Sequence, residues 1–317
     1  MNKIQSKIFN AINNHKKIII HRHKRPDLDS MGSQIALTEF IKLNFKDKEV
    51  IAATNDQFTG YEFIGKEIKV STEDYTDALI ILVDTANLDR ADMDFDISNN
   101  VSVKIDHHPN VEPFGNIMYV DQTISSTSEL LYHLFEAFRK ENDFTYNDKI
   151  MYALFCGIFG DTGGFSFSNT SNLTFKAMSH ISEYNIDYEN TVLRLKSFDT
   201  EIVRALGYAY SNIEIENGIG IIVFDKQFQE QYSISPTKIS VLANHLGMFK
   251  DLKAWVVFNE HDNFIRANFR SKGSLDISTI ATQYNGGGHK NASGAMIYEW
   301  NEVEEIKSKL LQLVSED

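Results

Sequence analysis

The first half of the chain alternates short apolar runs with longer stretches in which apolar residues recur every three or four positions. The apolar runs predict buried strands: Lys17–His21, Glu49–Ala53, Ala78–Asp84 and Val101–Asp106. The helical spacing predicts helices: Gly32–Phe45, Ser126–Lys140 and Asn147–Ile158. Strands separated by helices form parallel sheets, and a strand that is apolar throughout is expected where both faces of the sheet are covered. The pattern therefore predicts an α/β fold with a parallel, doubly wound sheet.

The pattern changes near residues 188–210, after a series of helical stretches that reaches about Arg204. Beyond it, the spacing predicts a strand over Gly218–Phe224 and a hairpin-like pair formed by Ala254–Asn259 and Phe264–Phe269. It also predicts further helices: Ser235–Leu246, Ser278–Tyr284 and Asn301–Val314. We therefore expect a larger domain over 1–190, a helical connector over 191–210 and a smaller α/β domain over 211–317.

Composition limits the classes of function that fit the chain. Its 317 residues suffice for two domains with apolar cores, and its longest apolar runs are too short to cross a membrane. The N-terminus has no apolar signal core, and the single cysteine, Cys156, cannot form an internal disulfide, so we expect a cytoplasmic protein without a membrane partner. The 31 Lys and Arg residues against 44 Asp and Glu residues give a net charge of −13. This balance disfavours a long nucleic acid as the main ligand and favours a small one.

Polar residues of the kind that bind metal ions follow the ends of the predicted strands. They are His23, Asp27 and Asp29 after the first strand, Asp84 at the end of the third, Asp106, His107 and His108 at the end of the fourth, and Asp161 after a predicted helix. Any one of them alone would be as readily explained as a turn, a helix cap or a structural histidine. Because the carboxyl ends of parallel strands meet at one edge of the sheet, the set predicts a single cleft. His21 competes with His23 for the ligand role, but it lies nearer the apolar strand, which favours a structural role for it.

The types of ligand narrow the choice of metal. Carboxylates and imidazoles without a thiolate favour manganese- or magnesium-like ions over structural zinc. Four aspartates carry the charge that would balance two divalent cations, and such a pair stabilises the attacking and leaving oxygens of a displacement at phosphorus. One carboxylate has to bridge the two ions. Asp84, at the end of the most buried strand, is our candidate for the bridge.

Four short motifs follow one another over about 140 residues of the chain. They are His23-x-x-x-Asp27-x-Asp29, Asp84 within Leu-Val-Asp-Thr-Ala, Asp106-His107-His108-Pro109-Asn110, and Gly160-Asp161-Thr162-Gly163. In this order they resemble the motifs of the DHH phosphoesterase family. The resemblance implies two manganese ions, with these ligands: His23, Asp27 and Asp84 for one, and Asp29, Asp84, His107 and Asp161 for the other. It further implies that His108 contacts the scissile phosphate and helps to protonate the leaving group, while Asp106 orients His107 or His108.

The second half of the chain carries a further signal of the same family. The stretch Arg266-Ala-Asn-Phe-Arg270-Ser271, followed by the glycine-rich segment Gly286–Gly294, resembles the DHH-associated substrate domain. The resemblance implies these substrate-binding residues: Arg266, Arg270, Ser271, Gly286, Gly287, Gly288 and His289. Glycine lets backbone N–H groups approach a phosphate closely, and Arg adds charge-assisted donors. Arg90 is a weaker phosphate-binding candidate, for which a surface role is equally reasonable.

Within the family, the whole chain looks like the bacterial type that cleaves short oligoribonucleotides and removes the 3′-phosphate of 3′-phosphoadenosine 5′-phosphate (pAp). Three alternatives stay open: a phosphodiesterase for cyclic dinucleotides or their linear products such as pApA, a manganese pyrophosphatase, and a regulatory nucleotide-binding module without turnover. The sequence also leaves open a homodimer, since the apolar stripe of Ser126–Lys140 could face a partner as easily as a core.

Overall fold

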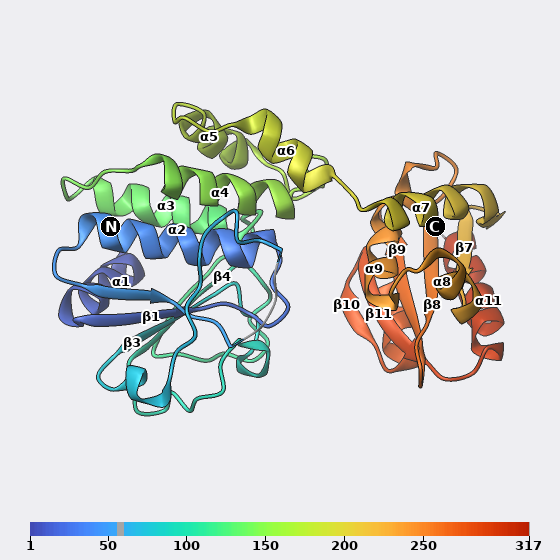
Figure 1. The fold of residues 1–317 in the computed structure, drawn as a ribbon, viewed down its shortest axis with the longest axis horizontal. Helices are drawn as coiled ribbons and strands as arrows, with labels where there is room; N and C mark the ends of the chain where they lie inside the picture. The colour runs from blue at the N-terminus through green and yellow to red at the C-terminus, as the bar shows by residue number, and fades with distance from the viewer. Residues whose placement is uncertain (56–59, 317) are drawn as a thin grey trace. The chain divides into compact units, whose positions relative to one another are not determined.

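A computed structural model describes residues 1–55 and 60–316 of the chain. The chain forms two compact units, Met1–Tyr188 and Glu189–Asp317, which we describe separately (Figure 1). Within the described residues, no helix combines the length and the apolar character that a membrane crossing requires.

The first unit is built on a parallel sheet in the order β2-β1-β3-β4-β5. Its strands are β1 (Lys17–His21), β2 (Glu49–Ala52), β3 (Leu79–Val83), β4 (Ser102–Asp106) and β5 (Ile117–Val120). The predicted parallel α/β fold is confirmed. In this strand order, the chain direction across the sheet reverses between β1 and β3, and doubly wound folds bind ligands beyond the carboxyl ends of the strands at such a point.

The first unit has six helices among its described residues. They are α1 (Lys3–Asn14), α2 (Leu28–Asn44), α3 (Thr127–Arg139), α4 (Asp148–Asp161), α5 (Asn172–Ile181) and α6 (Tyr188–Lys196), the last of which crosses the boundary between the units. Of these, α5 packs against α3 and α4 rather than against the sheet. Figure 1 shows α2, α3 and α4 lying together along one face of the sheet. The apolar stripe of α3, including Leu131, Leu134 and Phe135, is fully buried in the core of this same chain. That stripe therefore gives no support to the homodimer considered above.

The other face of the sheet is covered by short turns. Ile80 and Leu82 of β3 pack there with Tyr75, from the 3-10 turn η1 (Thr72–Tyr75), and with Met93 and Ile97. A second 3-10 turn, η2 (Leu88–Arg90), follows β3. Sequence reasoning did not predict β5 or α1, because β5 has only four residues and α1 presents only a narrow apolar stripe.

The second unit is built on a mixed sheet in the order β10-β11-β9-β8-β7-β6. Its strands are β6 (Glu214–Glu216), β7 (Ile219–Phe224), β8 (Ala254–Glu260), β9 (Ile265–Ser271), β10 (Gly287–His289) and β11 (Ala292–Ile297). The predicted hairpin is present as the antiparallel pair β8–β9. The sequence did not predict the pair β10–β11, because glycine weakens strands. Its pairing with β9 supplies the hydrogen bonds that hold it extended.

Helices cover both faces of the second sheet. They are α7 (Thr200–Asn212), α8 (Lys226–Tyr232), α9 (Pro236–Ile239), α10 (Ser278–Ala281) and α11 (Asn301–Ser315), with 3-10 turns η3 (Ser240–Asn244), η4 (Leu246–Met248) and η5 (Thr282–Tyr284). The single helix predicted over Ser235–Leu246 is wrong. The stretch is broken into α9, η3 and η4, in keeping with its β-branched residues and serines, which are poor helix formers. Most of the stretch predicted as a connector lies in α7, whose Ile202, Ala205 and Leu206 belong to the core of this unit.

Candidate active site

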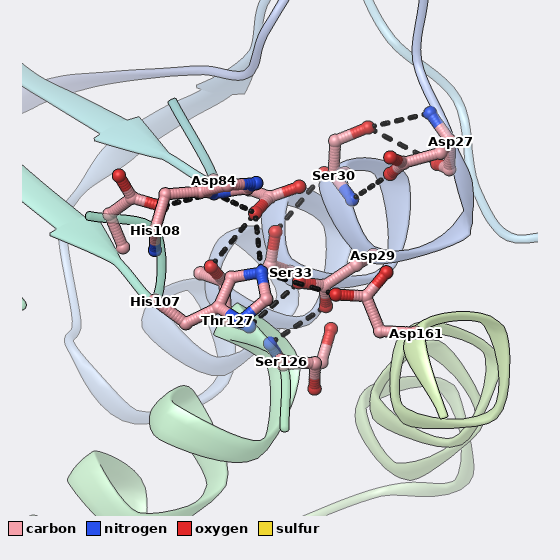
Figure 2. A network of polar contacts seen from close by, with 12 residues as sticks. Asp27, Asp29, Ser30, Ser33, Asp84, His107, His108, Ser126, Thr127 and Asp161 are labelled. Carbon is pink, nitrogen blue, oxygen red and sulfur yellow. Dashed lines mark hydrogen bonds and ion pairs between the residues drawn. The ribbon is translucent and has the colours of Figure 1, made fainter. Parts of the chain in front are cut away.

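The candidate site lies at the carboxyl edge of the first sheet, where β1, β3 and β4 end (Figure 2). The structure brings together the residues predicted for the reaction centre: His23, Asp27, Asp29, Asp84, His107, His108 and Asp161. His23 follows β1, Asp84 directly follows β3, and His107 directly follows β4. The remaining carboxylates come from helix ends, since Asp27 caps α2 and Asp161 is the last residue of α4.

Two groups of potential metal ligands meet at Asp84. In the first, His23 Nε2 lies 3.4 Å from Asp27 Oδ2 and 3.5 Å from Asp84 Oδ2. In the second, His107 Nε2 lies 3.1 Å from Asp161 Oδ2 and 3.6 Å from Asp84 Oδ1. One oxygen of Asp84 thus faces each histidine, and this carboxylate is shared between the groups. Asp29 completes the second group. One ligand atom each of Asp29, His107 and Asp161 lies within 4.8 Å of the other two.

The first turn of α3 holds two of these carboxylates in place. The backbone N–H groups of Thr127 and Ser128 donate to Asp29 Oδ2 and Oδ1, at 2.7 and 2.9 Å, and the Thr127 hydroxyl donates to Asp84 Oδ1 at 3.0 Å. N–H groups in the first turn of a helix have no partner within the helix, and the helix dipole favours negative charge there. Sequence reasoning missed this anchor, because nothing local indicated that Ser126–Lys140 begins beside the site.

The backbone at Asp84 is itself unusual. Its φ of 51° lies in the left-handed region, which costs a residue with a Cβ about 1–2 kcal/mol. The Asp84 N–H donates to the carbonyl of Ile105 at 3.0 Å, so the neighbouring strand β4 holds this conformation. Strain of this kind is tolerated where it places a functional side chain.

The electrostatics of the site favour bound cations. Burial lowers the pKa of His23, but the Asp27 and Asp84 carboxylates outweigh it and raise this pKa to about 10. For His107, burial is likewise outweighed, here by Asp161, Asp29 and Asp84, and the pKa is raised to about 10. Both histidines thus bind protons tightly when no metal ion competes, as expected where carboxylates crowd together.

The carboxylates respond to the same crowding. Burial, reinforced by the charges of Asp84 and Asp161, raises the pKa of Asp29 well above its usual range. Burial and the nearby Asp84 also raise the pKa of Asp161. At Asp27, by contrast, burial is outweighed by the hydrogen bond with His23, and the pKa is lowered.

The donor set fits divalent cations. It consists of carboxylate oxygens and imidazole nitrogens, without a thiolate. His107 Nε2 is buried and, among the described residues, has no hydrogen bond of good geometry, although it is aimed at the carboxylates. A metal ion would satisfy a nitrogen in that position. The structure therefore offers ligand groups that could bind metal on both sides of Asp84.

His21, the last residue of β1, and His23, which follows the strand, have different surroundings. The ring of His21 is fully buried, and its two nitrogens lie 3.0 Å from the carbonyl oxygen of Asp92 and 2.9 Å from the Tyr75 hydroxyl. Burial lowers the pKa of His21 to about 4. His21 thus belongs to the core on the face of the sheet that carries Tyr75, whereas His23 faces the Asp27 and Asp84 carboxylates.

Two buried cations near the site were missed by sequence reasoning. Arg22 is fully buried and pairs with Glu67 and Asp92, while its guanidinium donates to the carbonyl of His23 at 2.9 Å. Lys104 is fully buried within β4 and lies 3.3 Å from Asp106. For Lys104, its position inside a buried strand was the available signal, whereas Arg22 directly follows β1 and gave none. Arg90, a predicted phosphate-binding residue, is exposed on η2, next to Ala91, which pairs with His23.

The predicted substrate residues of the second unit fall on two faces of its sheet. Along β9, Arg266 and Arg270 alternate with Ala267 and Phe269, which face the apolar core. The guanidinium of Arg266 lies over Gly294 of β11, where a Cβ would meet its Nη2 at 2.3 Å. Arg270 donates from Nε to Asn244 Oδ1 at 2.8 Å, and burial together with the charge of Arg266 lowers its pKa. The two arginines therefore form a cationic face.

The glycine segment lies beside these arginines. Cross-strand pairing puts His289 opposite Ala292, which is opposite Arg270, so that His289 and Arg270 share a face. Gly287 pairs with Gly294 and lies on the same face as His289 and Arg270. Gly288 has a φ of 139°, a conformation that favours glycine. Gly286 allows a close approach of backbone to backbone, since a Cβ there would meet the carbonyl of Gly294 at 2.3 Å.

Ser271 lies apart from this cationic face. It follows the alternation of β9 onto the core side, where its hydroxyl donates to the carbonyl of Leu275 at 2.9 Å and accepts from Asn291 Nδ2 at 2.8 Å. The structure thus gives Ser271 partners that tie β9 to the following loop.

Comparison with known proteins agrees with these features. The model of the DHH family, N-terminal domain, matches residues 17–158, and that of the DHHA1 domain matches residues 217–316. The chain is 36% identical to the bifunctional oligoribonuclease and PAP phosphatase NrnA of Bacillus subtilis, over 99% of both chains. It is 34% identical to the probable protein of the same name from Streptococcus mutans, over 97% of this chain and 98% of the other.

A solved structure shares the fold. The crystal structure of an exopolyphosphatase-related protein from Bacteroides fragilis superposes with a TM-score of 0.88 and 24% identity, covering 98% of both chains. The parallel sheet, the motifs at its carboxyl edge and the full-length similarity to curated relatives agree, and the chain belongs to the DHH phosphoesterase family, whose members are hydrolases.

Proposed function

We propose that this enzyme is a manganese-dependent phosphoesterase that hydrolyses short oligoribonucleotides to 5′-mononucleotides and pAp to AMP and phosphate. The observation that carries the proposal is the Asp84 carboxylate, whose two oxygens face the two separate histidine–aspartate groups. The names of the relatives from B. subtilis and S. mutans support the choice of substrates. The single buried cysteine, Cys156, supports a cytoplasmic setting.

One displacement at phosphorus accounts for both substrates. Water attacks the phosphorus that is bonded to a ribose O3′, the P–O3′ bond breaks, and O3′ takes up a proton. If the phosphorus also carries a second nucleoside through O5′, the product is a 5′-mononucleotide. If it carries nothing more, the products are AMP and inorganic phosphate. A single reaction centre therefore serves both substrates.

The residues of the site have distinct tasks in this reaction. His23, Asp27 and Asp84 would hold one metal ion, and Asp29, Asp84, His107 and Asp161 the other. Two divalent ions at such a site lower the pKa of water and stabilise the charge of the phosphoryl oxygens. His108, hydrogen-bonded to Asp106 through Nδ1 at 2.9 Å, would deliver the proton that O3′ takes up.

Product analysis tests the function directly. The metal-free enzyme would be supplied with Mn²⁺, Mg²⁺ or Zn²⁺ and offered a 5′-phosphorylated RNA dinucleotide and pAp in parallel. We expect 5′-mononucleotides from both substrates, at the highest rate with Mn²⁺. Turnover of pyrophosphate alone would refute the choice of substrates, and nucleotide binding without any turnover would refute catalysis.

A phosphodiesterase for cyclic dinucleotides or their linear products is the second candidate. The chain is 26% identical to the cyclic-di-AMP phosphodiesterase GdpP of Geobacillus thermodenitrificans, over 89% of this chain but only 44% of that protein. The same product analysis decides between them if cyclic-di-AMP and pApA are added to the panel. Faster turnover of cyclic-di-AMP than of the dinucleotide and pAp would favour the second candidate.

We further propose that Arg266, Arg270, Gly286, Gly287, Gly288 and His289 bind a substrate phosphate other than the one being cleaved, with Arg90 and Ser271 as weaker candidates. Replacement of Arg270 by Ala should then raise KM for the dinucleotide about tenfold and leave kcat nearly unchanged, because a charge-assisted hydrogen bond to a phosphate contributes roughly 1.5–3 kcal/mol. Steady-state kinetics on the dinucleotide and on a minimal phosphodiester measure this.

The exposed Arg204 in α7 offers a control for the Arg270 variant. Arg204→Ala removes a cation from the same unit without touching the cationic face, and its KM should match that of the wild type. Loss of kcat on every substrate in Arg270→Ala, including the minimal phosphodiester, would place Arg270 at the chemical step and contradict the proposed role.

A further inference from the structure

Lys104 lies in a strand that the sequence predicts to be buried. The reaction described above assigns it no role. It lies inside β4 and is fully buried. Its Nζ donates to the carbonyl of Ala86 at 2.7 Å and to Asn110 Oδ1 at 3.1 Å. The burial of an ammonium group is costly unless it is paired and hydrogen-bonded. The retention of such a cation three residues before His107 needs a physical reason.

The third contact of Lys104 leads to the reaction centre. Its Nζ lies 3.3 Å from Asp106 Oδ2, and both side chains are fully buried. The other oxygen of this carboxylate, Oδ1, accepts from the backbone N–H of His108 at 3.2 Å and lies 2.9 Å from its Nδ1. The hydrogen bond with His108 outweighs burial, and with the charge of Lys104 it holds the pKa of Asp106 at about 2.

We propose that Lys104 is a positioning residue for His108. It fixes the Asp106 carboxylate with Oδ2 toward its own ammonium group and Oδ1 toward Nδ1 of the imidazole. With Nδ1 engaged in this way, the ring is oriented to use Nε2 toward the leaving group. Among the described residues, Asp106 Oδ2 has no hydrogen-bond partner of good geometry, so Lys104 supplies the charge that holds it. This inference rests on the proposed phosphoesterase reaction.

The step that depends on Lys104 is departure of the leaving group. The oxygen of water forms a bond to phosphorus and its excess proton passes to solvent. The P–O3′ bond breaks, its electron pair stays on O3′, and the proton on Nε2 of His108 is transferred to that oxygen. A p-nitrophenolate leaving group is stable as an anion and does not require this proton. The contribution of a well-oriented His108 should therefore depend on the leaving group.

A purely structural role makes a different prediction. Through Ala86 and Asn110, Lys104 also ties together the segments that follow β3 and β4, which carry Asp84 and His107. If this were its whole contribution, loss of Lys104 would disturb the metal ligands and slow all substrates alike. The two roles are thus distinguished by the ratio of two rates.

The test compares the RNA dinucleotide with the p-nitrophenyl ester of a nucleoside 5′-phosphate, both with Mn²⁺. Lys104→Met keeps a side chain of similar length without the charge. We expect its kcat on the dinucleotide to fall about 100-fold, the lower range of general acid catalysis, and its kcat on the p-nitrophenyl ester to fall less than about threefold. KM for both substrates should stay near the wild-type value. Addition of Lys104→Met to His108→Ala should cause little further loss, because residues that act as a unit are not additive.

Two further variants complete the design. Asp106→Asn keeps the shape of the side chain, so it tests the same chain of contacts even if Lys104→Met fails to fold. We expect the amide oxygen introduced in this variant to turn toward Lys104. The loss of rate should again depend on the leaving group.

Lys48→Met is the control, since the Lys48 ammonium also donates to two carbonyls, of Asn13 and His15, away from the site. Equal losses on both substrates in Asp106→Asn, or weaker Mn²⁺ binding in a folded Lys104→Met, would overturn the inference. If the wild type cleaves neither substrate, the proposed function itself fails.

Discussion

Asp84→Asn is expected to abolish cleavage of both the RNA dinucleotide and pAp, lowering kcat by about 10³-fold or more, since the loss of a shared metal ligand removes several kcal/mol of transition-state stabilisation. The replacement is chosen for its shape. Asparagine tolerates the left-handed backbone that Asp84 adopts, and its amide oxygen can still accept from the Thr127 hydroxyl. The variant loses the negative charge between the two histidines, and an amide nitrogen, which does not bind a metal ion, replaces the oxygen that faces His23. Product analysis with Mn²⁺, together with calorimetric titration of Mn²⁺, measures both consequences.

The control for this variant is Asp89→Asn, which removes a carboxylate from an exposed position five residues along the chain. It should retain wild-type activity and metal binding. Asp84→Asn should keep the unfolding temperature close to that of the metal-free wild type and bind fewer than two Mn²⁺ ions per chain. Retention of activity on pAp with loss of activity on the dinucleotide would contradict a single reaction centre for both.

Much of the reaction centre was predictable because its residues occupy strand ends. His23, Asp84 and His107 each follow a buried strand that was predicted from its apolar residues, and the strands themselves are confirmed. The parallel arrangement then places the strand ends at one edge, which is a property of the fold class rather than of any particular contact. The spacing could thus indicate convergence but not which oxygen of Asp84 faces which histidine.

The contacts that support these residues were not predictable from the sequence. Thr127 belongs to a helix that begins more than forty residues after Asp84, and only the folded chain shows that its first turn meets Asp29 and Asp84. Lys104 interrupts an apolar run, yet an isolated lysine in a strand is usually exposed, and its partners Ala86 and Asn110 lie on two different loops. Such contacts depend on tertiary packing, which local pattern does not encode.

The second unit shows a different limit. Gly287 and Gly288 favour a turn by local propensity, but they lie in β10, an edge strand that pairs with β11, which itself pairs with β9. The separation of Ser271 from the arginines follows from the alternation of side chains along β9. That alternation was available from the sequence once the strand was assigned, and it would have placed Ser271 on the core side with Ala267 and Phe269.

Gly157→Ala is expected to destabilise the first unit by about 2 kcal/mol, the typical cost of overpacking a close contact, and to lower its unfolding temperature by about 4–8 °C. A Cβ at Gly157 would meet Ser128 Oγ at 2.0 Å and Asp29 Oδ1 at 2.8 Å. Gly157 also faces Gly32 of α2, so closely that a Cβ on Gly32 would lie 2.9 Å from the Gly157 nitrogen. The absence of side chains at this crossing of α2 and α4 is what allows α3 to present its N–H groups to Asp29. Differential scanning calorimetry of the metal-free protein measures the effect.

Gly207→Ala makes the matched control, because Gly207 also lies inside a helix, α7, and a Cβ there would meet nothing within 4 Å. With no contact to break, alanine should stabilise the second unit by about 0.5–1 kcal/mol through its higher helix propensity. The same substitution thus acts in opposite directions at the two positions. Because the added methyl group of Gly157→Ala displaces the Ser128 and Asp29 side chains, this variant should also bind Mn²⁺ more weakly, whereas Gly207→Ala should not. An unchanged unfolding temperature and unchanged Mn²⁺ affinity in Gly157→Ala would mean that the contact between α2, α3 and α4 does not position the carboxylate of Asp29.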